Sequence, residues 1–258
     1  ARQDSKLKGS IALSQLKRAI TEFNSATEDG TVVQQQGEAR EVLRNLKDLP
    51  RHIRAKPWVR AVSLQMRTVL GDNLNRVLNQ IETIYQLETS AKPIVLGANV
   101  KQVLMWSKLR ALDSIAPIKV QAFIEGLVAA KGENGAIDGG IQKEIYRFLI
   151  EKERRGQYVQ LLPLIEAFYP ALEGQTQDQR QLRLLQIRTA IRIGRNEEAL
   201  VLAKTMIQAF PNSGDAWIAY AETAQANEDY FTAERAWAKL TGAHPDGAPR
   251  WREAMGQR

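Results

Sequence analysis

The chain has 258 residues and no cysteine, which excludes disulfide bonds, thiolate metal sites and cysteine nucleophiles. It has no apolar run of about 18 residues or more, the length that predicts a transmembrane helix. Its 36 Lys and Arg against 29 Asp and Glu give a formal net charge of +7, which favours an acidic partner such as nucleic acid, an anionic lipid surface or an acidic protein.

The first predicted elements are helices at residues 5–27 and 32–48, because their apolar residues recur at spacings of three and four. The stretch 50–57, PRHIRAKP, has a proline at each end, and we expect it to be a loop. Strand-like alternation of apolar and polar residues is nearly absent from the chain. The sequence therefore predicts an all-α fold.

The apolar pattern then continues from Trp58 to about Leu87. It predicts one long helix, on the order of 45 Å from end to end, unless Gly71 breaks it. A helix of that length is typical of a bundle or a coiled coil. Residues 1–90 are therefore predicted to form a helical bundle or a coiled-coil arm.

Further helices are expected at residues 99–114 and 117–131, within a helical connector that spans 91–139. The glycine-rich stretch 132–140 is the predicted domain boundary. In the last predicted domain, 140–258, the helices come in pairs. These pairs are 140–155 with 157–169, 178–193 with 196–209, and 214–227 with 230–242, followed by the start of another helix at Pro249.

The paired helices contain an internal repeat. Alignment of the chain on itself with one constant offset places Ala199 on Ala233 and Pro211 on Pro245. A looser upstream copy, at 153–162, aligns with 191–200 at a slightly larger offset. One pair of antiparallel helices cannot bury its apolar faces alone, whereas stacked pairs share a continuous core. The repeat therefore predicts a stack of helical hairpins.

The clearest copy shows which residues define the repeat. Its first helix carries Trp217, Tyr220 and Ala221, and its second carries Ala233 and Trp237 before Pro245. This pattern resembles the tetratricopeptide repeat, and the resemblance extends from Ile141 to the end of the chain. In the other copies, Arg183 stands at the position of the early Trp and Leu161 at a position of the small Ala. The resemblance implies an α-solenoid that binds proteins and has no catalytic activity, with both tryptophans in its core.

The resemblance also implies a binding groove on the first helix of each pair, with Trp217 marking the phase. The groove candidates are Lys143, Tyr146, Arg147, Ile150, Leu184, Arg188, Ile191, Arg192 and Arg195, and the next pair adds Asp215, Ile218, Glu222 and Gln225. Arginines in such a stripe favour an acidic, partly apolar or amphipathic partner segment. The alternative is a solvated surface whose arginines pair locally with Glu153, Glu197 or Glu222.

A second basic cluster, called the basic patch here, lies in the N-terminal part of the chain. It consists of Arg40, Arg44, Lys47, Arg51, Arg54, Lys56 and Arg60, with Arg67 as a further member. Such a cluster can contact the phosphates of nucleic acid or of a lipid surface. However, Trp58 is the one aromatic residue within it, fewer than a platform for single-stranded nucleic acid normally has. A solvated surface, or a docking face for an acidic protein, is the favoured interpretation.

Nothing in the sequence predicts catalysis, a metal or a cofactor. The two histidines, His52 and His244, lie in proline-containing loops, and no nucleophile–base pair or zinc-binding motif is present. Both the cytoplasm and a bacterial periplasm or envelope are compatible with the composition.

We therefore expect a non-catalytic scaffold or adaptor that recruits a protein partner within a larger assembly. Association with a membrane would require an anchor outside this chain. A polyanion-binding helical-repeat protein is the alternative, and a helical support attached to an enzyme is a third interpretation. Self-association is a further expectation, because Trp251 in the incomplete last repeat would lack a neighbouring helix.

Overall fold

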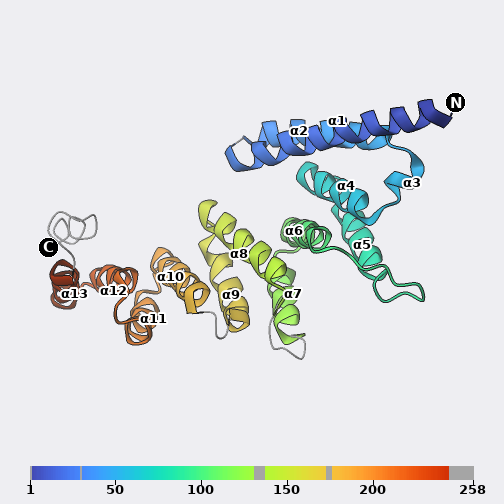
Figure 1. Ribbon diagram of the computed structural model, residues 1–258. Helices are drawn as coiled ribbons and strands as arrows, with labels where there is room; N and C mark the ends of the chain where they lie inside the picture. The colour runs from blue at the N-terminus through green and yellow to red at the C-terminus, as the bar shows by residue number, and fades with distance from the viewer. Residues whose placement is uncertain (1, 30, 131–136, 173–175, 244–258) are drawn as a thin grey trace. The chain divides into compact units, whose positions relative to one another are not determined.

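The fold is entirely helical, as the sequence predicts. A computed structural model describes residues 2–29, 31–130, 137–172 and 176–243. These residues form thirteen α-helices and one short 3-10 helix, and no strand occurs among them (Figure 1). The predicted all-α class is confirmed, whereas the helix expected to start at Pro249 lies outside the described residues.

The chain divides into two compact units. The N-terminal unit comprises residues 1–120 and 138–148, and the C-terminal unit comprises residues 121–137 and 149–258. Helix α8 (Gly139–Arg154) contributes residues to both units. The finer division of the sequence into an arm, a connector and a repeat domain stays a prediction.

The N-terminal unit is built from consecutive helices that contact one another. They are α1 (Arg2–Asp29), α2 (Val32–Asp48), α3 (Arg51–Arg54), α4 (Pro57–Leu70), α5 (Leu74–Tyr85) and α6 (Ala98–Ile115). Helices α1 and α2 run side by side (Figure 1) and bury Leu16, Phe23 and Val42 in a shared core. The hydroxyl of Thr31 accepts a hydrogen bond from the Gln34 N–H and thereby caps the start of α2.

The loop expected at residues 50–57 contains one helical turn, α3, so this prediction was incomplete. The N–H groups of Ile53 and Arg54 both donate to the Pro50 carbonyl, at 2.9 and 3.0 Å. The side chain of Ile53 packs against the core beneath α1 and α2. The packing of Ile53 holds the segment against the core. Pro50 has no N–H group that needs a hydrogen-bond partner, so a turn of helix can begin there.

The pattern expected as one long helix from Trp58 to about Leu87 forms two helices, because the break that the sequence allowed at Gly71 occurs. Gly71 ends α4 in a left-handed conformation, with φ of 71°, and Asn73 follows with φ of 37°. The Asp72 N–H donates to the Arg67 carbonyl at 2.9 Å, which closes the helix end. The chain then turns, and α5 packs back on α4.

Helix α4 has two apolar faces, which explains why it lies between two groups of helices. Val59 and Met66 belong to the core that α4 shares with α1 and α2. Ala61 and Leu64 belong to a second core, shared with α5, α6 and Leu96. Helix α4 therefore packs on both sides, and its second face fixes where α5 can lie.

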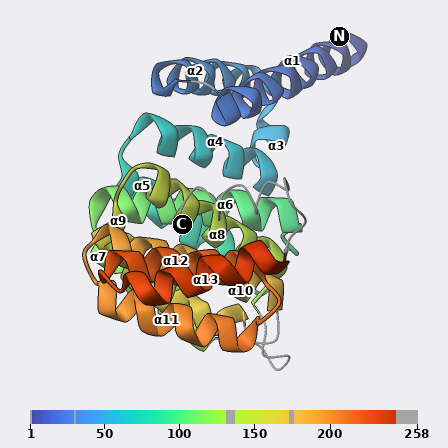
Figure 2. The same ribbon diagram turned by 90° about the vertical axis from the view of Figure 1, so that its left-hand side faces the viewer.

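The C-terminal unit contains helical hairpins in sequence. Its elements are most of α7 (Ile118–Ala129), the end of α8, α9 (Tyr158–Phe168), the 3-10 helix η1 (Tyr169–Leu172), α10 (Thr176–Arg192), α11 (Asn196–Ala209), α12 (Gly214–Ala226) and α13 (Tyr230–Ala243). Successive helices from α9 to α13 contact each other, and α10 also contacts α12. Figures 1 and 2 show α12 and α13 side by side as one hairpin.

Equivalent turns join the two helices of each hairpin. Gly156, Gly194 and Glu228 have left-handed backbones, with φ of 68°, 78° and 60°. Their separations along the chain equal the two offsets found by aligning the sequence on itself. In each turn the next N–H donates to a carbonyl five residues back, as from Arg195 to Ala190 at 2.9 Å. Glu228 therefore occupies the place of Gly194 in the last hairpin.

The repeat residues pack as the resemblance implies. Ala199, Ala221 and Ala233 are buried where helices cross, and Trp237 is buried in the core of the last hairpin. Trp217 is partly buried, and its Nε1 donates to the Pro211 carbonyl at 2.7 Å. Trp237 therefore has a packing role, whereas Trp217 lies only partly in the core. Pro245 and Trp251 lie outside the described residues.

Arg183, which replaces the early Trp of the repeat, has a packing role of its own. Its guanidinium lies 3.9 Å from the centre of the Tyr169 ring in η1, and its Nη1 donates to the Gln186 side chain at 2.6 Å. A planar guanidinium stacks on an aromatic face in much the way that a second aromatic ring does. The substitution therefore keeps a stacked contact at the position where the repeat has lost its indole.

Candidate functional site

The candidate groove residues on α10 occupy one face of that helix, at spacings of three and four. Arg188 is half exposed, and its Nε lies 3.3 Å from Oε1 of Glu153 at the end of α8. Arg195, at the N-terminal end of α11, pairs with Glu198 at 3.3 Å. Local pairing thus occurs at Arg188 with Glu153, a partner named from the sequence, and at Arg195 with Glu198, which was not named.

Arg192 differs from its neighbours. It is exposed, and no carboxylate in the described part of the chain forms an ion pair with it. Leu184 and Ile191 lie on the same helix, are partly buried and pack against the core between α10, α11 and α12. This face of α10 therefore offers Arg192, the weakly paired Arg188 and the outer parts of two apolar side chains.

The upstream groove candidates are divided between the two units. Lys143, Tyr146 and Arg147 belong to the N-terminal unit, whereas Ile150 belongs to the C-terminal unit. Lys143 and Arg147 are exposed, and Tyr146 and Ile150 are partly buried. A groove that includes all of these residues with those of α10 stays a prediction.

The basic patch is spread over three helices. Arg40, Arg44 and Lys47 lie on α2, Arg51 and Arg54 on α3, and Lys56 and Arg60 at the start of α4. All are exposed except Arg60, which is half-buried. Arg44 pairs with Glu41 on its own helix at 2.6 Å. The patch is therefore a broad basic surface, and only its last members approach a concave feature.

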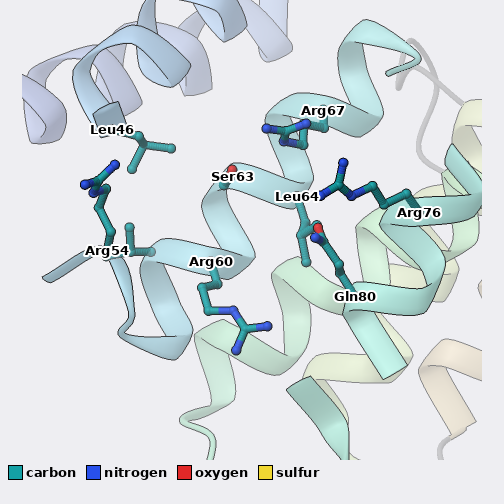
Figure 3. A pocket seen from close by; sticks show the side chains of 9 residues that line it. Leu46, Arg54, Arg60, Ser63, Leu64, Arg67, Arg76 and Gln80 are labelled. Carbon is teal, nitrogen blue, oxygen red and sulfur yellow. The ribbon is translucent and has the colours of Figure 1, made fainter. Parts of the chain in front are cut away.

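That concave feature, called the arginine pocket here, has a volume of about 230 Å³. It lies within the N-terminal unit, where α4 and α5 meet α3 and the end of α2 (Figure 3). Its lining consists of Leu46, Arg54, Val59, Arg60, Ser63, Leu64, Arg67, Arg76 and Gln80. The four arginines of this lining face no Asp or Glu within it.

The arginines reach the pocket from different helices. In Figure 3, Arg67 from α4 and Arg76 from α5 extend towards the same space, with Ser63 and Gln80 close to it. Leu46, Val59 and Leu64 are buried and form the apolar part of the lining. The pocket thus combines guanidinium donors, two neutral polar groups and an apolar floor.

Sequence reasoning missed Arg76, because the prediction of a continuous helix placed it a long way along the axis from Arg60. Gly71 is the sequence feature from which the proximity of Arg76 to Arg67 could have been predicted. A chain reversal there brings the first turns of α5 beside the last turns of α4, and so brings Arg76 beside Arg67. A prediction of a helical hairpin at Gly71 would have placed Arg67 and Arg76 in one cluster.

Carboxylates with altered proton affinity lie elsewhere in the N-terminal unit. Partial burial raises the pKa of Glu144, although the charges of Arg147, Lys143 and Arg110 act in the opposite direction. For Glu88, burial also acts to raise the pKa, but hydrogen bonds from Lys101 and from the Leu96 N–H, with the Lys101 charge, outweigh it and lower the pKa. Neither group lines the arginine pocket.

Within the described ranges, no three residues of the types His, Asp and Glu come together in a way that could hold a metal ion. No helix in the same part of the chain combines the length and the apolar composition needed to cross a bilayer.

Comparison with known proteins identifies the C-terminal part. Residues 190–257 match the family model described as tetratricopeptide repeat. Searches of curated proteins and of solved structures gave no match. The matched residues include α11, α12 and α13, whose turns and buried alanines are described above. Tetratricopeptide repeats generally mediate protein–protein interactions and are typically non-catalytic. Residues 190–257 are therefore similar to the tetratricopeptide repeat, and this match supports a helical repeat solenoid in the C-terminal part of the chain.

Proposed function

We propose that this chain is a non-catalytic scaffold whose repeats recruit an acidic, partly apolar segment of a partner protein within a larger assembly. The observation that supports it best is the surface of α10, where Arg192 is exposed and unpaired among the described residues. Arg188 lies one helical turn away on the same face. The family match to an interaction repeat gives this surface its context.

The existing ion pair does not prevent such binding. Arg188 and Glu153 form a partly exposed pair, with the Arg188 side chain 51% exposed. Exposed pairs of this kind contribute only about 0–1 kcal/mol to stability. A partner carboxylate could therefore replace Glu153 at little cost, and a two-pronged contact to each guanidinium would favour the exchange.

The next hairpin limits the charge pattern of the partner. Asp215 and Glu222 on α12 are the groove candidates that follow those of α10, and Glu222 is exposed. We infer that the segment carries its acidic residues over α10 and is neutral or basic over α12. Ile191 and Ile218, both partly buried, leave apolar surface for one side chain of the segment.

Affinity capture with the full chain would test this proposal. A partner should be retained at about 50 and about 200 mM salt and lost with the double variant R188E/R192E. The matched control is K204E/K239E, which makes the same change of charge at exposed positions on the second helices α11 and α13. Equal retention by both variants would contradict the proposal.

Quantification with the identified partner peptide would sharpen the result. We expect R188E/R192E to weaken binding by about 1–3 kcal/mol, because charge-assisted hydrogen bonds are lost. Circular dichroism melting should show both variants to be folded, since neither changes a buried side chain. Any association with a membrane assembly belongs to the same proposal and would take place through such a partner.

A further inference from the structure

The arginine pocket contains an uncompensated positive charge. Arg54, Arg60, Arg67 and Arg76 line a space of about 230 Å³, and the lining has no carboxylate. No ion pair or hydrogen bond of their guanidiniums links any of the four to another described residue.

Some other cations of the same unit have acidic partners. Lys101 pairs with Glu88 at 3.0 Å, Lys108 pairs with Glu82, and Arg18 pairs with Glu22 at 2.9 Å. Carboxylates are thus available in this unit, yet none lies in the pocket. The positive charge at the pocket is therefore available to an anionic ligand.

The shape of the pocket limits the size of that ligand. Its volume of about 230 Å³ is below the roughly 300–1,000 Å³ of pockets that enclose whole drug-sized ligands. It would therefore hold a compact charged group, with any remainder of the ligand outside. Ser63 and Gln80 supply neutral donors, and buried Leu64 supplies apolar contact.

The number of donors identifies the chemistry of that group. Each guanidinium presents a planar fork that binds two oxygen atoms at once. A carboxylate carries one charge and two oxygens, whereas a phosphate monoester carries a charge of about −1.5 to −2 and three acceptor oxygens. The guanidiniums of Arg67 and Arg76 extend towards the same space, and two further arginines belong to the lining. Such a set matches a phosphate or pyrophosphate group better than a single carboxylate.

We propose that the arginine pocket between α3, α4 and α5 is a binding site for the phosphate group of a small phosphorylated ligand. Arg67 and Arg76 grip the phosphate from adjacent helices, and Arg54 and Arg60 add charge at the rim. The ligand is either a soluble phosphorylated compound or the headgroup of a phosphorylated lipid. The site is independent of the repeat surface proposed above, because both arginines of the grip belong to the N-terminal unit.

The first experiment titrates pyrophosphate into the full chain by isothermal calorimetry, at about 50 and about 200 mM salt. We expect saturable binding to one site. The variant R67Q/R76Q should bind about tenfold more weakly or worse. The matched control R40Q/R51Q removes the same charge from exposed positions outside the pocket, and its affinity should stay within about twofold of that of the unaltered chain.

A second variant separates geometry from charge. R67K/R76K keeps the net charge but loses the planar forks. We expect its affinity to lie between those of the unaltered chain and R67Q/R76Q, while equal affinity to the unaltered chain would contradict a two-pronged grip. Circular dichroism melting checks that each variant is folded. The repeat variant R188E/R192E should bind pyrophosphate normally, so failure of one proposal can be told from failure of the other.

Vesicle flotation then distinguishes the two ligand sources. Phosphatidylcholine vesicles are compared with vesicles that also contain a phosphatidylinositol phosphate. Pocket-dependent binding to the second kind, displaced by pyrophosphate, assigns a lipid headgroup. Pyrophosphate binding without vesicle binding assigns a soluble ligand.

Three results would overturn the site. They are the absence of saturable binding to pyrophosphate and vesicles, equal weakening in R67Q/R76Q and R40Q/R51Q, and tighter binding of single-stranded RNA that both variants weaken equally. The last two would indicate a diffuse basic surface.

Discussion

The hairpin of α4 and α5 in the N-terminal unit and the hairpins of the C-terminal unit close in nearly the same way. At Gly71 and at Gly194, a left-handed residue donates to a carbonyl three residues back and the next N–H donates to one five residues back. In the repeats the second helix starts directly afterwards, whereas after α4 one more residue, Asn73, precedes α5. A similar hairpin is thus built by sequences that share no repeat pattern.

The two regions differ in what packs between the helices. The C-terminal hairpins meet through alanines such as Ala199, Ala221 and Ala233, with Trp237 filling the remaining space. The helices of the N-terminal unit meet mainly through large aliphatic residues, such as Ile81 and Leu104. Small residues at helix crossings must recur at fixed places, while aliphatic residues can exchange with one another. A repeat is therefore recognisable in one region and not in the other.

Loss of the largest side chain in the last hairpin should have the strongest effect. Trp237→Ala is expected to lower the free energy of unfolding of the C-terminal unit by about 3–5 kcal/mol, because it leaves a cavity. Chemical denaturation followed by circular dichroism checks this. Trp237→Phe is the matched control and should cost clearly less, since the indole Nε1 has no hydrogen-bond partner within the described chain. Equal losses would show that packing at this position is not the cause.

A hydrogen-bonded pair of asparagines joins neighbouring repeats. Asn227 Nδ2 donates to the Asn196 carbonyl at 2.8 Å, and Asn196 Nδ2 donates to the Ala226 carbonyl at 2.7 Å. Asn227→Ala should lower the free energy of unfolding by about 1–3 kcal/mol, because a partly buried carbonyl loses its donor. A double-mutant cycle with Asn196→Ala measures the coupling. Additive effects would mean that the pair does not act as a unit.

The left-handed turn positions provide a direct comparison of the two units. Gly71→Ala and Gly194→Ala should each lower the free energy of unfolding by about 1–2 kcal/mol through backbone strain. Backbone strain is the whole cause, because an added Cβ meets no atom within 4 Å at either glycine. Glu228→Gly, at the equivalent turn, should be neutral or stabilising because it removes such strain. Thermal melting of the three variants measures these differences. A stabilised Gly71→Ala would show that the α4–α5 turn differs from the turns of the repeats.

The last prediction concerns Tyr85 and a loss of stability that begins only at alkaline pH. Burial, with the negative charges of Glu82 and Glu88, raises the pKa of Tyr85 from 10.0 to about 12. The folded state therefore holds this proton more tightly than the unfolded state does. Its contribution to stability is complete below pH 10 and should be lost as the pH rises from 10 to 12.

Absorbance of the tyrosinate band during alkaline titration, together with melting curves, checks this shift. Tyr85→Phe should remove the steepest part of the alkaline loss while keeping most of the packing. A titration midpoint near 10 for Tyr85 would contradict its burial against α6, where its hydroxyl donates to the Lys101 carbonyl at 3.5 Å.

Local and periodic features of this protein could be predicted from its sequence. The helical spacing, the offsets at which the chain aligns on itself, and the pairing of Trp237 with small alanines indicated the all-α fold and the repeat. These features depend on interactions between residues a few positions apart, or on packing that recurs once in every repeat. They can therefore be predicted from the order of the residues, without knowing which distant residues are in contact.

Only the tertiary structure decided which distant residues meet. The reversal at Gly71 turned one predicted helix into a hairpin and brought Arg76 beside Arg67. Folding also placed Glu153 beside Arg188, so that part of the predicted groove is already paired. The physical reason is the same in both cases. A glycine permits a left-handed turn without requiring it, and the packing of one helix against the next selects the turn, and with it the neighbours of each charge.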